Sequence, residues 1–406
     1  MTKLRLTLSQ IFLTPWRAVP VLGLVQILTW GAMFYPPVLT VPLIAAEHGW
    51  TLTFAMGGFS GGLFVGGIAA PTVGKLIDRI GGNGVMALGS LLGAAGLVAL
   101  ATLTHPIAYF ITWMVLGVAM AASLYDPAFA TLGRIFGAGA RRPITLITFA
   151  GGFASTVSWP STLFLIDAVG WRGTYYIYAA ILAFVSAPLL AFALPRERID
   201  PLAPVPGRAA AHWPTIKPAG FPFAVLIAAF TLYAFIPSAL SAHLLAIFKR
   251  GGIDAATAVA IGALFGPAQV LVRLCEFIFG SNAHPLNIAR SALTLLLCAF
   301  VMLLLAGVST PYAAAFAIMF GMSNGLLTLS RGTVPLALFG PVGYGQIVGR
   351  IAGPSLVMQS AAPFVLAFVA ERVSDKGALA LVMLVGCLSL ACFLMVRRPQ
   401  PSSIGV

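Results

Sequence analysis

Long apolar stretches, separated mostly by short polar ones, run along nearly the whole chain of 406 residues. Each is about as long as the roughly 20 residues that a helix needs to cross the hydrocarbon of a bilayer. Helices also satisfy their own backbone hydrogen bonds, which lipid cannot do. The pattern therefore predicts an all-α polytopic membrane protein with twelve transmembrane helices. Their expected ranges are 19–45, 51–74, 84–104, 107–133, 143–168, 174–194, 221–247, 256–279, 288–308, 311–330, 344–370 and 377–396.

The one long polar interruption follows the sixth predicted helix and contains six prolines and four basic residues. Proline fixes extended backbone and removes a hydrogen-bond donor, so we predict an aqueous linker here. The chain then divides into a six-helix bundle at 1–194, a linker at 195–220 and a second six-helix bundle at 221–406. Because the other connections are short, consecutive helices are expected to run antiparallel in two pseudo-symmetric bundles.

Composition and charge support a membrane protein with a defined orientation. Hydrophobic residues make up 60% of the chain, charged residues only 8%, and the mean hydropathy is +1.00, which excludes a water-soluble core. Basic residues favour the cytoplasmic side of a membrane, and seventeen of them fall in one set of segments against five in the other. The larger set is Lys3, Arg5, Arg17, Lys75, Arg79, Arg134, Arg141, Arg142, Arg196, Arg198, Arg208, Lys217, Arg290, Arg331, Arg350, Arg397 and Arg398. The smaller set is Arg172, Lys249, Arg250, Arg372 and Lys376.

This asymmetry predicts that both termini and the linker are cytoplasmic, in a multi-pass protein of the cell (inner or plasma) membrane. The net charge of +13 is spread over separate loops, whereas a nucleic-acid-binding surface gathers its basic residues in one patch. We therefore expect lipid and a small molecule as partners, no nucleic acid, and a protein that functions as a monomer.

A glycine-rich charged segment joins the second and third predicted helices. It reads Gly74-Lys75-Leu76-Ile77-Asp78-Arg79-Ile80-Gly81-Gly82. Glycine permits sharp turns and close approach of helices, and the adjacent acid and base can link neighbouring helix ends. The segment resembles the signature loop of the major facilitator superfamily, although Gly82 and Asn83 stand where that loop usually has two basic residues. The resemblance implies a secondary transporter with two halves that alternate access. The residues expected to form its cytoplasmic gate are Gly74, Asp78, Arg79 and Gly81.

Shorter patterns resemble the monocarboxylate and oxalate/formate porters within that superfamily. They lie at residues 31–37, 48–51, 167–172, 243–244 and 251–254, and at Arg273. The resemblance implies a small organic anion, such as a monocarboxylate, transported with protons. The first and eleventh predicted helices have no lysine, so a second cationic anchor used in part of that branch is absent.

A proton-driven exporter of drugs or other toxic small molecules is the alternative. Two patterns typical of other branches are degraded here: Trp113 stands where many facilitators have an arginine, and the antiporter pattern is reduced to Ser158-Trp159-Pro160. These departures weaken the alternative without removing it.

Ionisable groups inside predicted helices are costly in hydrocarbon and so are candidates for function. Arg273 and Glu276 are three residues apart, on one helical face, where they can pair. In one interpretation they repeat the Lys75–Asp78 loop motif near the cytoplasm. In the other, Arg273 lies deeper and its guanidinium receives a carboxylate, for which its fork of donors is well suited, while Glu276 takes a proton.

Two further titratable groups have open roles. Asp126 lies in the inner third of the fourth predicted helix. It can serve as a cytoplasmic gate partner of Arg134, Arg141 or the Asp78 loop, or it can carry the coupled proton. His243 lies near the outer end of the seventh predicted helix, where histidine can act as a pH-sensitive outer gate or simply face interfacial water.

Uncharged polar groups in the predicted helices can line a central cavity or form helix–helix hydrogen bonds. Together with Arg273, the candidate substrate-binding residues are Gln26, Trp30, Tyr35, Gln269, Asn324 and Gln359. An enzyme would need a clustered nucleophile, base or metal set, and the buried ionisable groups are instead scattered over different helices. We therefore expect a transporter without cofactor or metal, ahead of a membrane-embedded enzyme or a non-transporting sensor.

Overall fold

The computed structural model describes residues 15–195, 217–280 and 283–397, and all secondary structure in these ranges is helical. The first part of the chain contains α2 (Ala18–Thr29), η1 (Trp30–Phe34), α3 (Pro37–His48), α4 (Leu52–Ile80), α5 (Gly82–Thr102), α6 (Pro106–Ser123), α7 (Tyr125–Phe136), η2 (Gly137–Ala140), α8 (Arg141–Gly151), α9 (Ala154–Ile181), η3 (Leu182–Ser186) and η4 (Leu189–Ala193). The second part contains α10 (Gly220–Arg250), α11 (Ala255–Ala263), α12 (Phe265–Phe279), α13 (Pro285–Ala306), α14 (Thr310–Phe339), α15 (Tyr344–Arg372) and α16 (Asp375–Met395). Both termini and most of the predicted linker lie outside the described residues.

The expectation of an all-helical membrane protein is confirmed. Ten helical stretches of the described chain are long and apolar enough to cross a membrane. One of them, Pro106–Ala193, runs for 88 residues, far beyond the roughly 20 that one crossing needs. It covers three of the predicted helices, at 107–133, 143–168 and 174–194. The count of twelve crossings and the orientation of the termini stay predictions.

Several predicted helix ends are wrong because basic residues were assigned to loops. The structure places the following basic residues, which lie just outside the predicted ranges, within helices: Lys75, Arg79, Arg134, Arg141, Arg142 and Arg331. Arg134 shows the reason, since its guanidinium donates to the carbonyls of Ile77 and Asp78 near the end of α4. A long stem carries the charge to acceptors at a neighbouring helix end, so the helix continues past the residue that hydropathy marks as its end.

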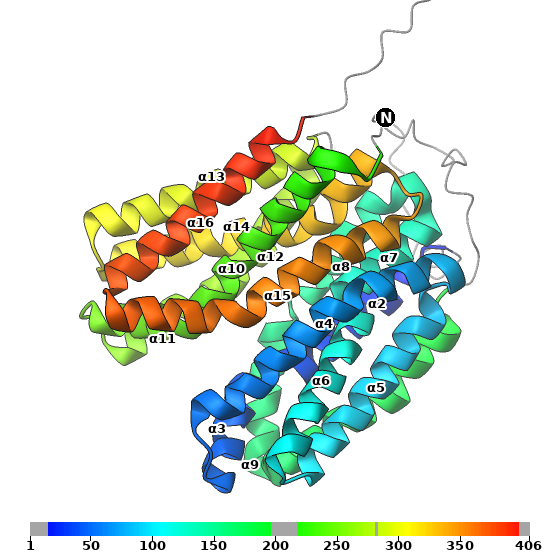
Figure 1. Ribbon diagram of the computed structural model, residues 1–406, viewed down its shortest axis with the longest axis horizontal. Helices are drawn as coiled ribbons and strands as arrows, with labels where there is room; N and C mark the ends of the chain where they lie inside the picture. Colours follow the sequence, from blue (N-terminus) through cyan, green and yellow to red (C-terminus); the bar gives the residue numbers. More distant parts are fainter. Residues whose placement is uncertain (1–14, 196–216, 281–282, 398–406) are drawn as a thin grey trace, which may run out of the picture.

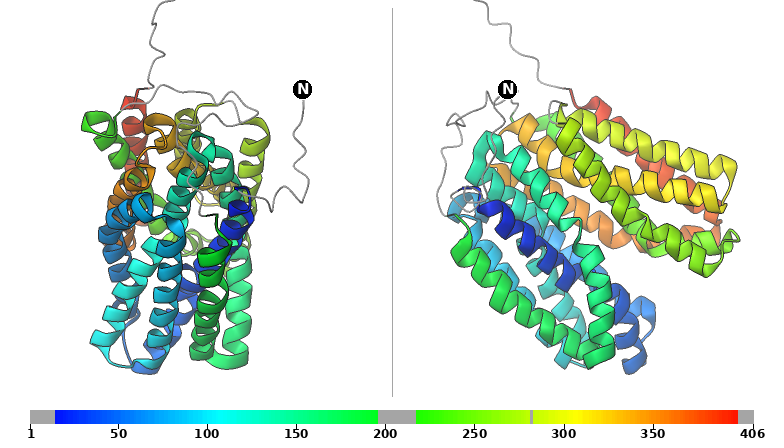
Figure 2. Two further views of the ribbon diagram at one scale, coloured as in Figure 1. Left: turned by 90° about the vertical axis from the view of Figure 1, so that its right-hand side faces the viewer. Right: turned by 180° about the vertical axis from the view of Figure 1, so that it is seen from behind.

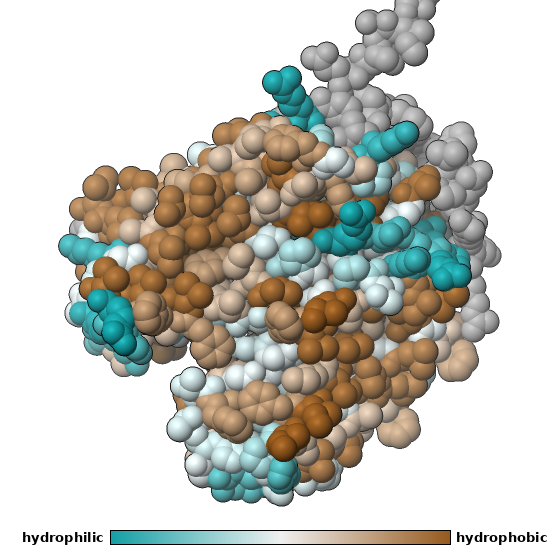
Figure 3. Space-filling model, viewed as in Figure 1, coloured by the Kyte–Doolittle hydropathy of each residue, from teal (hydrophilic) through white to brown (hydrophobic). Residues whose placement is uncertain are grey.

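The helices gather in two groups that follow the chain. Figure 1 shows α2 to α9 in one group and α10 to α16 in the other, with α4 and α15 side by side where the groups meet. The groups converge near α7, α8 and the start of α15 and diverge toward α3 and α11, as the right-hand view of Figure 2 also shows. We call these the closed end and the open end. Figure 3 shows the notch that separates the two groups at the open end.

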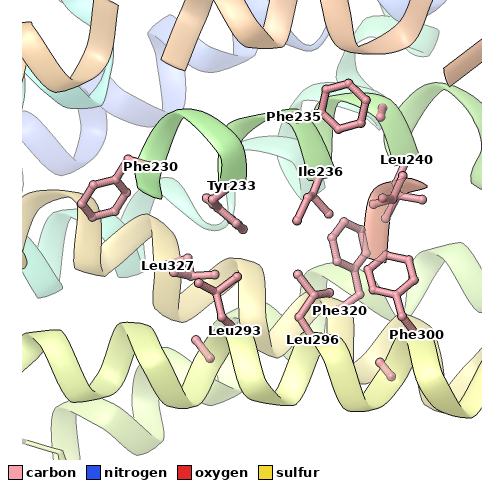
Figure 4. Close-up of a cluster of buried hydrophobic side chains, with 14 of the residues drawn as sticks. Phe230, Tyr233, Phe235, Ile236, Leu240, Leu293, Leu296, Phe300, Phe320 and Leu327 are labelled. Atoms are coloured by element: carbon pink, nitrogen blue, oxygen red, sulfur yellow. The ribbon is translucent and has the colours of Figure 1, made fainter. Parts of the chain in front are cut away.

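Each group has its own apolar core. In the second group, rings and aliphatic side chains of α10, α13 and α14 interlock, including Phe230, Ile236, Leu296 and Phe320 (Figure 4). In the first group, one core surrounds Trp113. Another, nearer the closed end, also takes in Tyr344 of α15. The two groups therefore share a packed interface at the closed end.

Glycines allow the two groups to approach along α4 and α15. A Cβ added to Gly74 would lie 2.1 Å from the carbonyl oxygen of Gly345, and one added to Gly353 would lie 2.8 Å from that of Gly67. Within the first group, a Cβ on Gly117 would lie 1.9 Å from the carbonyl oxygen of Gly62. At such distances only glycine permits backbone-to-backbone packing. The α4–α15 contact thus brings the ends of both helices together at the closed end.

The first predicted helix is irregular at its centre. A π turn at Trp30–Phe34 separates α2 from α3, and Pro36 and Pro37 follow it after Tyr35. Proline removes backbone donors, and single π turns of this kind are frequent at functional sites. Trp30 begins this irregular turn and Tyr35 ends it, and both belong to the residues described next.

Candidate functional site

Arg273 lies between the two groups of helices, with an exposed fraction of 2%. From α12, its Nη1 donates across the interface to the carbonyl of Thr148 on α8 at 2.8 Å. Its Nε and Nη2 donate to the Gly325 carbonyl and to Gln269 Oε1, both at 3.3 Å. The guanidinium therefore contacts both groups of helices, and it lies near the middle of α14.

Aromatic side chains lie in the neighbourhood of this guanidinium. The hydroxyls of Tyr35, Tyr125 and Tyr233 are within electrostatic reach of Arg273. The ring of Trp30 lies 5.1 Å from that of Tyr125 and 6.0 Å from that of Tyr35. The site thus combines one buried cation with a wall of amphipathic rings.

The remaining predicted binding residues fall into two sets. Gln26 is fully buried: it accepts from Trp30 Nε1 at 3.1 Å and donates to the Ser123 carbonyl at 3.0 Å, which fixes the Trp30 ring. Asn324 accepts a short hydrogen bond from the hydroxyl of Tyr233. These contacts and that of Gln269 link predicted residues to the surroundings of Arg273.

Gln359 and His243 lie apart from that set. The backbone carbonyl of Gln359 accepts from Ser238 at 2.8 Å, and His243 Nε2 lies 3.0 Å from the carbonyl oxygen of Pro363. Both contacts join α10 to α15 within the second group. This contact of His243 therefore lies within the second group, whereas a gate between the groups would require a contact with the first.

Glu276 does not form the pair with Arg273 that their spacing allows. The Glu276 carboxylate, 6% exposed, instead accepts from Arg141 Nη2 at 3.1 Å across the interface. The same guanidinium donates to the carbonyls of Gly280 and Ala283. Arg141 begins α8, so the last turn of α12 is tied to the first turn of α8. Among the described residues, no acidic side chain forms a salt bridge with Arg273.

Asp126 forms its ion pair with a residue that had been assigned to a loop. Its Oδ2 lies 2.8 Å from Arg331 Nη2 on α14, so the expected partners Arg134, Arg141 and the Asp78 loop are wrong. The reason is that α14 continues past 330 and carries Arg331 to the interface. Asp126 Oδ1 and Arg331 Nε are buried without a hydrogen-bond partner in the described structure.

The signature loop also crosses the interface at the closed end. Asp78 accepts from the backbone amides of Gly345 at 2.9 Å and Gln346 at 2.7 Å, in the first turn of α15. A carboxylate is favourable at a helix start because the amides and the helix dipole both attract it. Gly81 has a φ of +93° and ends α4, while Arg79 is exposed.

The charge contacts at the closed end follow a repeated plan. Asp78 near the end of α4 meets the first turn of α15, and Glu276 near the end of α12 meets the first residue of α8. The two acids thus occupy corresponding places in the two groups, as the repeated-motif interpretation expects. Arg273 lies one turn farther in and is buried, as the other interpretation expects, whereas its counterpart Lys75 is exposed.

Several residues of the site were missed from the sequence. Thr148 contributes only its carbonyl, which no side-chain pattern reveals. Tyr125 precedes Asp126, and its hydroxyl lies against Gly151. Gly151 and Gly152 lie at the end of α8, and this pair of glycines was the signal available in the sequence. The structure shows why glycine is needed there: a Cβ on Gly152 would lie 2.5 Å from Arg273 Nη1.

The arrangement suits recognition of an anion more than covalent chemistry. A buried guanidinium binds a carboxylate through two parallel hydrogen bonds. In the described part of the chain, no three His, Cys, Asp or Glu side chains are grouped so that they could hold a metal ion. Two ion pairs, Arg141–Glu276 and Arg331–Asp126, connect the two groups toward the closed end, which is where a gate between two membrane faces would act.

Comparison with known proteins identifies the architecture. The family profile of the Major Facilitator Superfamily matches residues 22–353. No curated protein matches the sequence.

Solved structures match over almost the whole chain. The human organic anion transporter MFSD10 (TETRAN) has a TM-score of 0.70 at 17% identity, covering 93% of this chain and 99% of its own. The proton:xylose symporter XylE has a TM-score of 0.69 at 11% identity, covering 94% and 96%. FucP in the outward conformation has a TM-score of 0.68 at 12% identity, covering 96% and 100%. At these identities the likeness concerns the fold.

Proposed function

The chain belongs to the major facilitator superfamily, and from this premise we propose that it moves a small organic anion across the cell membrane by alternating access, coupled to protons. It is a transporter and not an enzyme. In the proposal, twelve transmembrane helices form two six-helix halves, with both termini and the linker cytoplasmic. The closed end then faces the cytoplasm. The substrate enters from the open end and binds at Arg273.

The observation that carries the anion proposal is the buried cation without an acidic partner. Arg273 is 2% exposed, and it donates to two carbonyls and one amide oxygen, which are neutral. Burying an uncompensated charge is costly. A substrate carboxylate would supply the missing negative charge. It would replace the two longer hydrogen bonds of Arg273, those to the Gly325 carbonyl and to Gln269 at 3.3 Å.

Other features support the substrate class and the branch. MFSD10 is described as an organic anion transporter, and the patterns at residues 31–37 and 167–172 resemble monocarboxylate and oxalate/formate porters. The ring wall of Trp30, Tyr35 and Tyr125 favours an anion with an apolar or planar body. We propose Gln269 and Asn324 as neighbours that orient the bound substrate.

Proton coupling is assigned to Asp126. When substrate and proton are bound, a neutral Asp126 would release Arg331, and one of the ties between the halves would be lost. Asp78 and the Arg141–Glu276 pair complete the gate at this end. Their separation would open the site to the other face, while Gly74 allows the gate to close again.

The test is substrate-dependent counterflow in proteoliposomes. Purified protein is first screened by thermal shift against small carboxylates and against lipophilic drugs, and each hit is tested for exchange of labelled substrate. Exchange of a carboxylate is expected. Exchange of a neutral or cationic drug, with no carboxylate transported, would favour the exporter. Binding without exchange would favour a sensor.

Replacing Asp126 by asparagine should separate exchange from accumulation. Asparagine cannot carry a proton, so a pH gradient that is acidic outside should no longer drive the substrate above its equilibrium level. Exchange at equal pH should remain. Uptake and counterflow are measured on the same vesicles at several external pH values, with Asp254→Asn at the exposed start of α11 as control. If the Asp126→Asn variant still accumulated substrate in response to the pH gradient, Asp126 would not be the residue that carries the coupled proton.

Replacing Gly152 by alanine should weaken transport by displacing Arg273. The new Cβ would lie 2.5 Å from Nη1, so the guanidinium must move, and overpacking of this kind costs about 1–3 kcal/mol. We expect substrate affinity to fall about tenfold. Gly61→Ala is the matched control, because no atom lies within 4 Å of its added Cβ. Equal affinities in the two variants would contradict the proposed position of the substrate.

A further inference from the structure

An apolar groove runs along the outside of the molecule where α4, α15 and α10 meet. Its volume is about 550 Å³, and eight of its nine lining residues are apolar or glycine. From α4 it takes Gly67, Ile68 and Pro71, and from α15 it takes the stretch between Gly353 and Ala361. Both halves thus contribute walls, so the groove spans the seam that must change during transport. Thr231 of α10 is the one polar residue in the lining, and its hydroxyl has no partner in the described structure.

Exposed cations continue the same helix faces toward the closed end. On α4, Lys75 is seven residues beyond Ile68, and two helical turns bring it back to the same face. On α15, Arg350 is four residues before Pro354, so it extends the lining face of that helix. Both cations are exposed, and the Arg350 guanidinium lies 4.7 Å from the ring centre of Phe223 on α10. Figure 3 shows hydrophilic side chains gathered over these ends of α4 and α15, beside apolar surface.

We propose that this groove binds an anionic glycerophospholipid, with its phosphate between Lys75 and Arg350 and an acyl chain along the groove. The apolar lining matches a hydrocarbon chain, and the two cations match a phosphate at headgroup depth. Because Gly67 and Gly353 belong to different halves, a lipid seated here contacts both. It therefore stabilises the conformation in which α4 and α15 are packed together at the closed end.

The test measures lipid binding to the purified protein and does not depend on transport. Native mass spectrometry and thermal unfolding are recorded in detergent with added dioleoylphosphatidylglycerol or dioleoylphosphatidylcholine. Wild-type protein should retain phosphatidylglycerol and gain thermal stability from it, and phosphatidylcholine should give a smaller effect. Lys75→Gln with Arg350→Gln should lower the affinity for phosphatidylglycerol about 25-fold, since each cation contributes about a factor of five.

Matched variants separate the two parts of the site. Lys75→Arg with Arg350→Lys keeps both charges and should keep binding, while Arg372→Gln removes an exposed cation from the other end of α15 and should have no effect. Ala361→Phe fills the groove and should weaken long-chain lipid more than its dihexanoyl analogue. Equal binding of the two lipids, or full binding by the double glutamine variant, would overturn the proposal. An unchanged response in Ala361→Phe would remove the groove from the site.

Discussion

Arg273→Lys is expected to lower the specific transport of a small carboxylate about a hundredfold, although it keeps a basic residue at the site. Lysine offers one compact ammonium group, whereas arginine offers two parallel N–H donors that match a carboxylate. Loss of one charge-assisted hydrogen bond costs about 1.5–3 kcal/mol, which corresponds to about 10- to 150-fold in affinity. A buried lysine also loses its charge more readily than arginine, because desolvation disfavours the ammonium form.

The measurement is counterflow and equilibrium binding of the carboxylate identified by the thermal-shift screen. Arg372→Lys, an exposed arginine that lies over the ring of Phe368, is the control for a general effect of the substitution. Arg273→Ala should abolish transport, and its thermal unfolding reports whether the fold persists. Unchanged kinetics in Arg273→Lys would remove Arg273 from the substrate site. If Arg273→Lys transports a neutral substrate normally, the anion proposal is wrong and the transporter fold stands.

Hydropathy predicted the helices well where both ends are polar. Residues 221–247 were expected as a helix and α10 runs Gly220–Arg250, and residues 377–396 correspond to α16, Asp375–Met395. The prediction failed at α14, which was ended at 330 but runs to Phe339. Arg331 was assigned to a loop from the sequence alone, because its half-buried ion-pair partner Asp126 is 205 positions away.

The sequence predicted which charged residues belong to the site, but it did not predict which residues they contact. The cost of charge in a membrane selected Arg273, Glu276 and Asp126 from their positions alone. Their partners could not be predicted, because Thr148, Arg141 and Arg331 reach them across the interface between two groups of helices. Local spacing instead favoured the pair of Arg273 with Glu276. Which residues face one another depends on how the groups meet, and no local pattern encodes that arrangement.

Gly74→Ala is expected to shift the protein away from the conformation described here without unfolding it. The added Cβ would lie 2.1 Å from the carbonyl oxygen of Gly345, which is backbone of the other half. Overpacking at such a contact costs about 1–3 kcal/mol. In the proposed alternating-access cycle α4 and α15 separate at the closed end, so this cost falls only on the closed arrangement. An energy of about 1.4 kcal/mol changes a two-state population ratio tenfold.

Gly117→Ala is the matched comparison. Its added Cβ would lie 1.9 Å from the carbonyl oxygen of Gly62, and both residues belong to the first half, so every conformation carries the strain. This variant should lower the thermal stability and leave the balance between conformations unchanged. Gly74→Ala should instead leave the thermal stability nearly unchanged and shift the balance away from the closed arrangement. The Asp78 contact with the start of α15 should be lost together with that arrangement.

Distances between spin labels at the ends of α4 and α15, with hydrogen exchange at the amides of Gly345 and Gln346, measure this difference. Gly74→Ala should give longer label distances and faster exchange, because those amides lose the Asp78 carboxylate that accepts from them. Substrate should still bind, since Arg273 lies farther in. If both variants lost stability equally and neither changed the distances, α4 and α15 would be a fixed pair. The halves would then have to move about some other contact, and alternating access at this seam would be wrong.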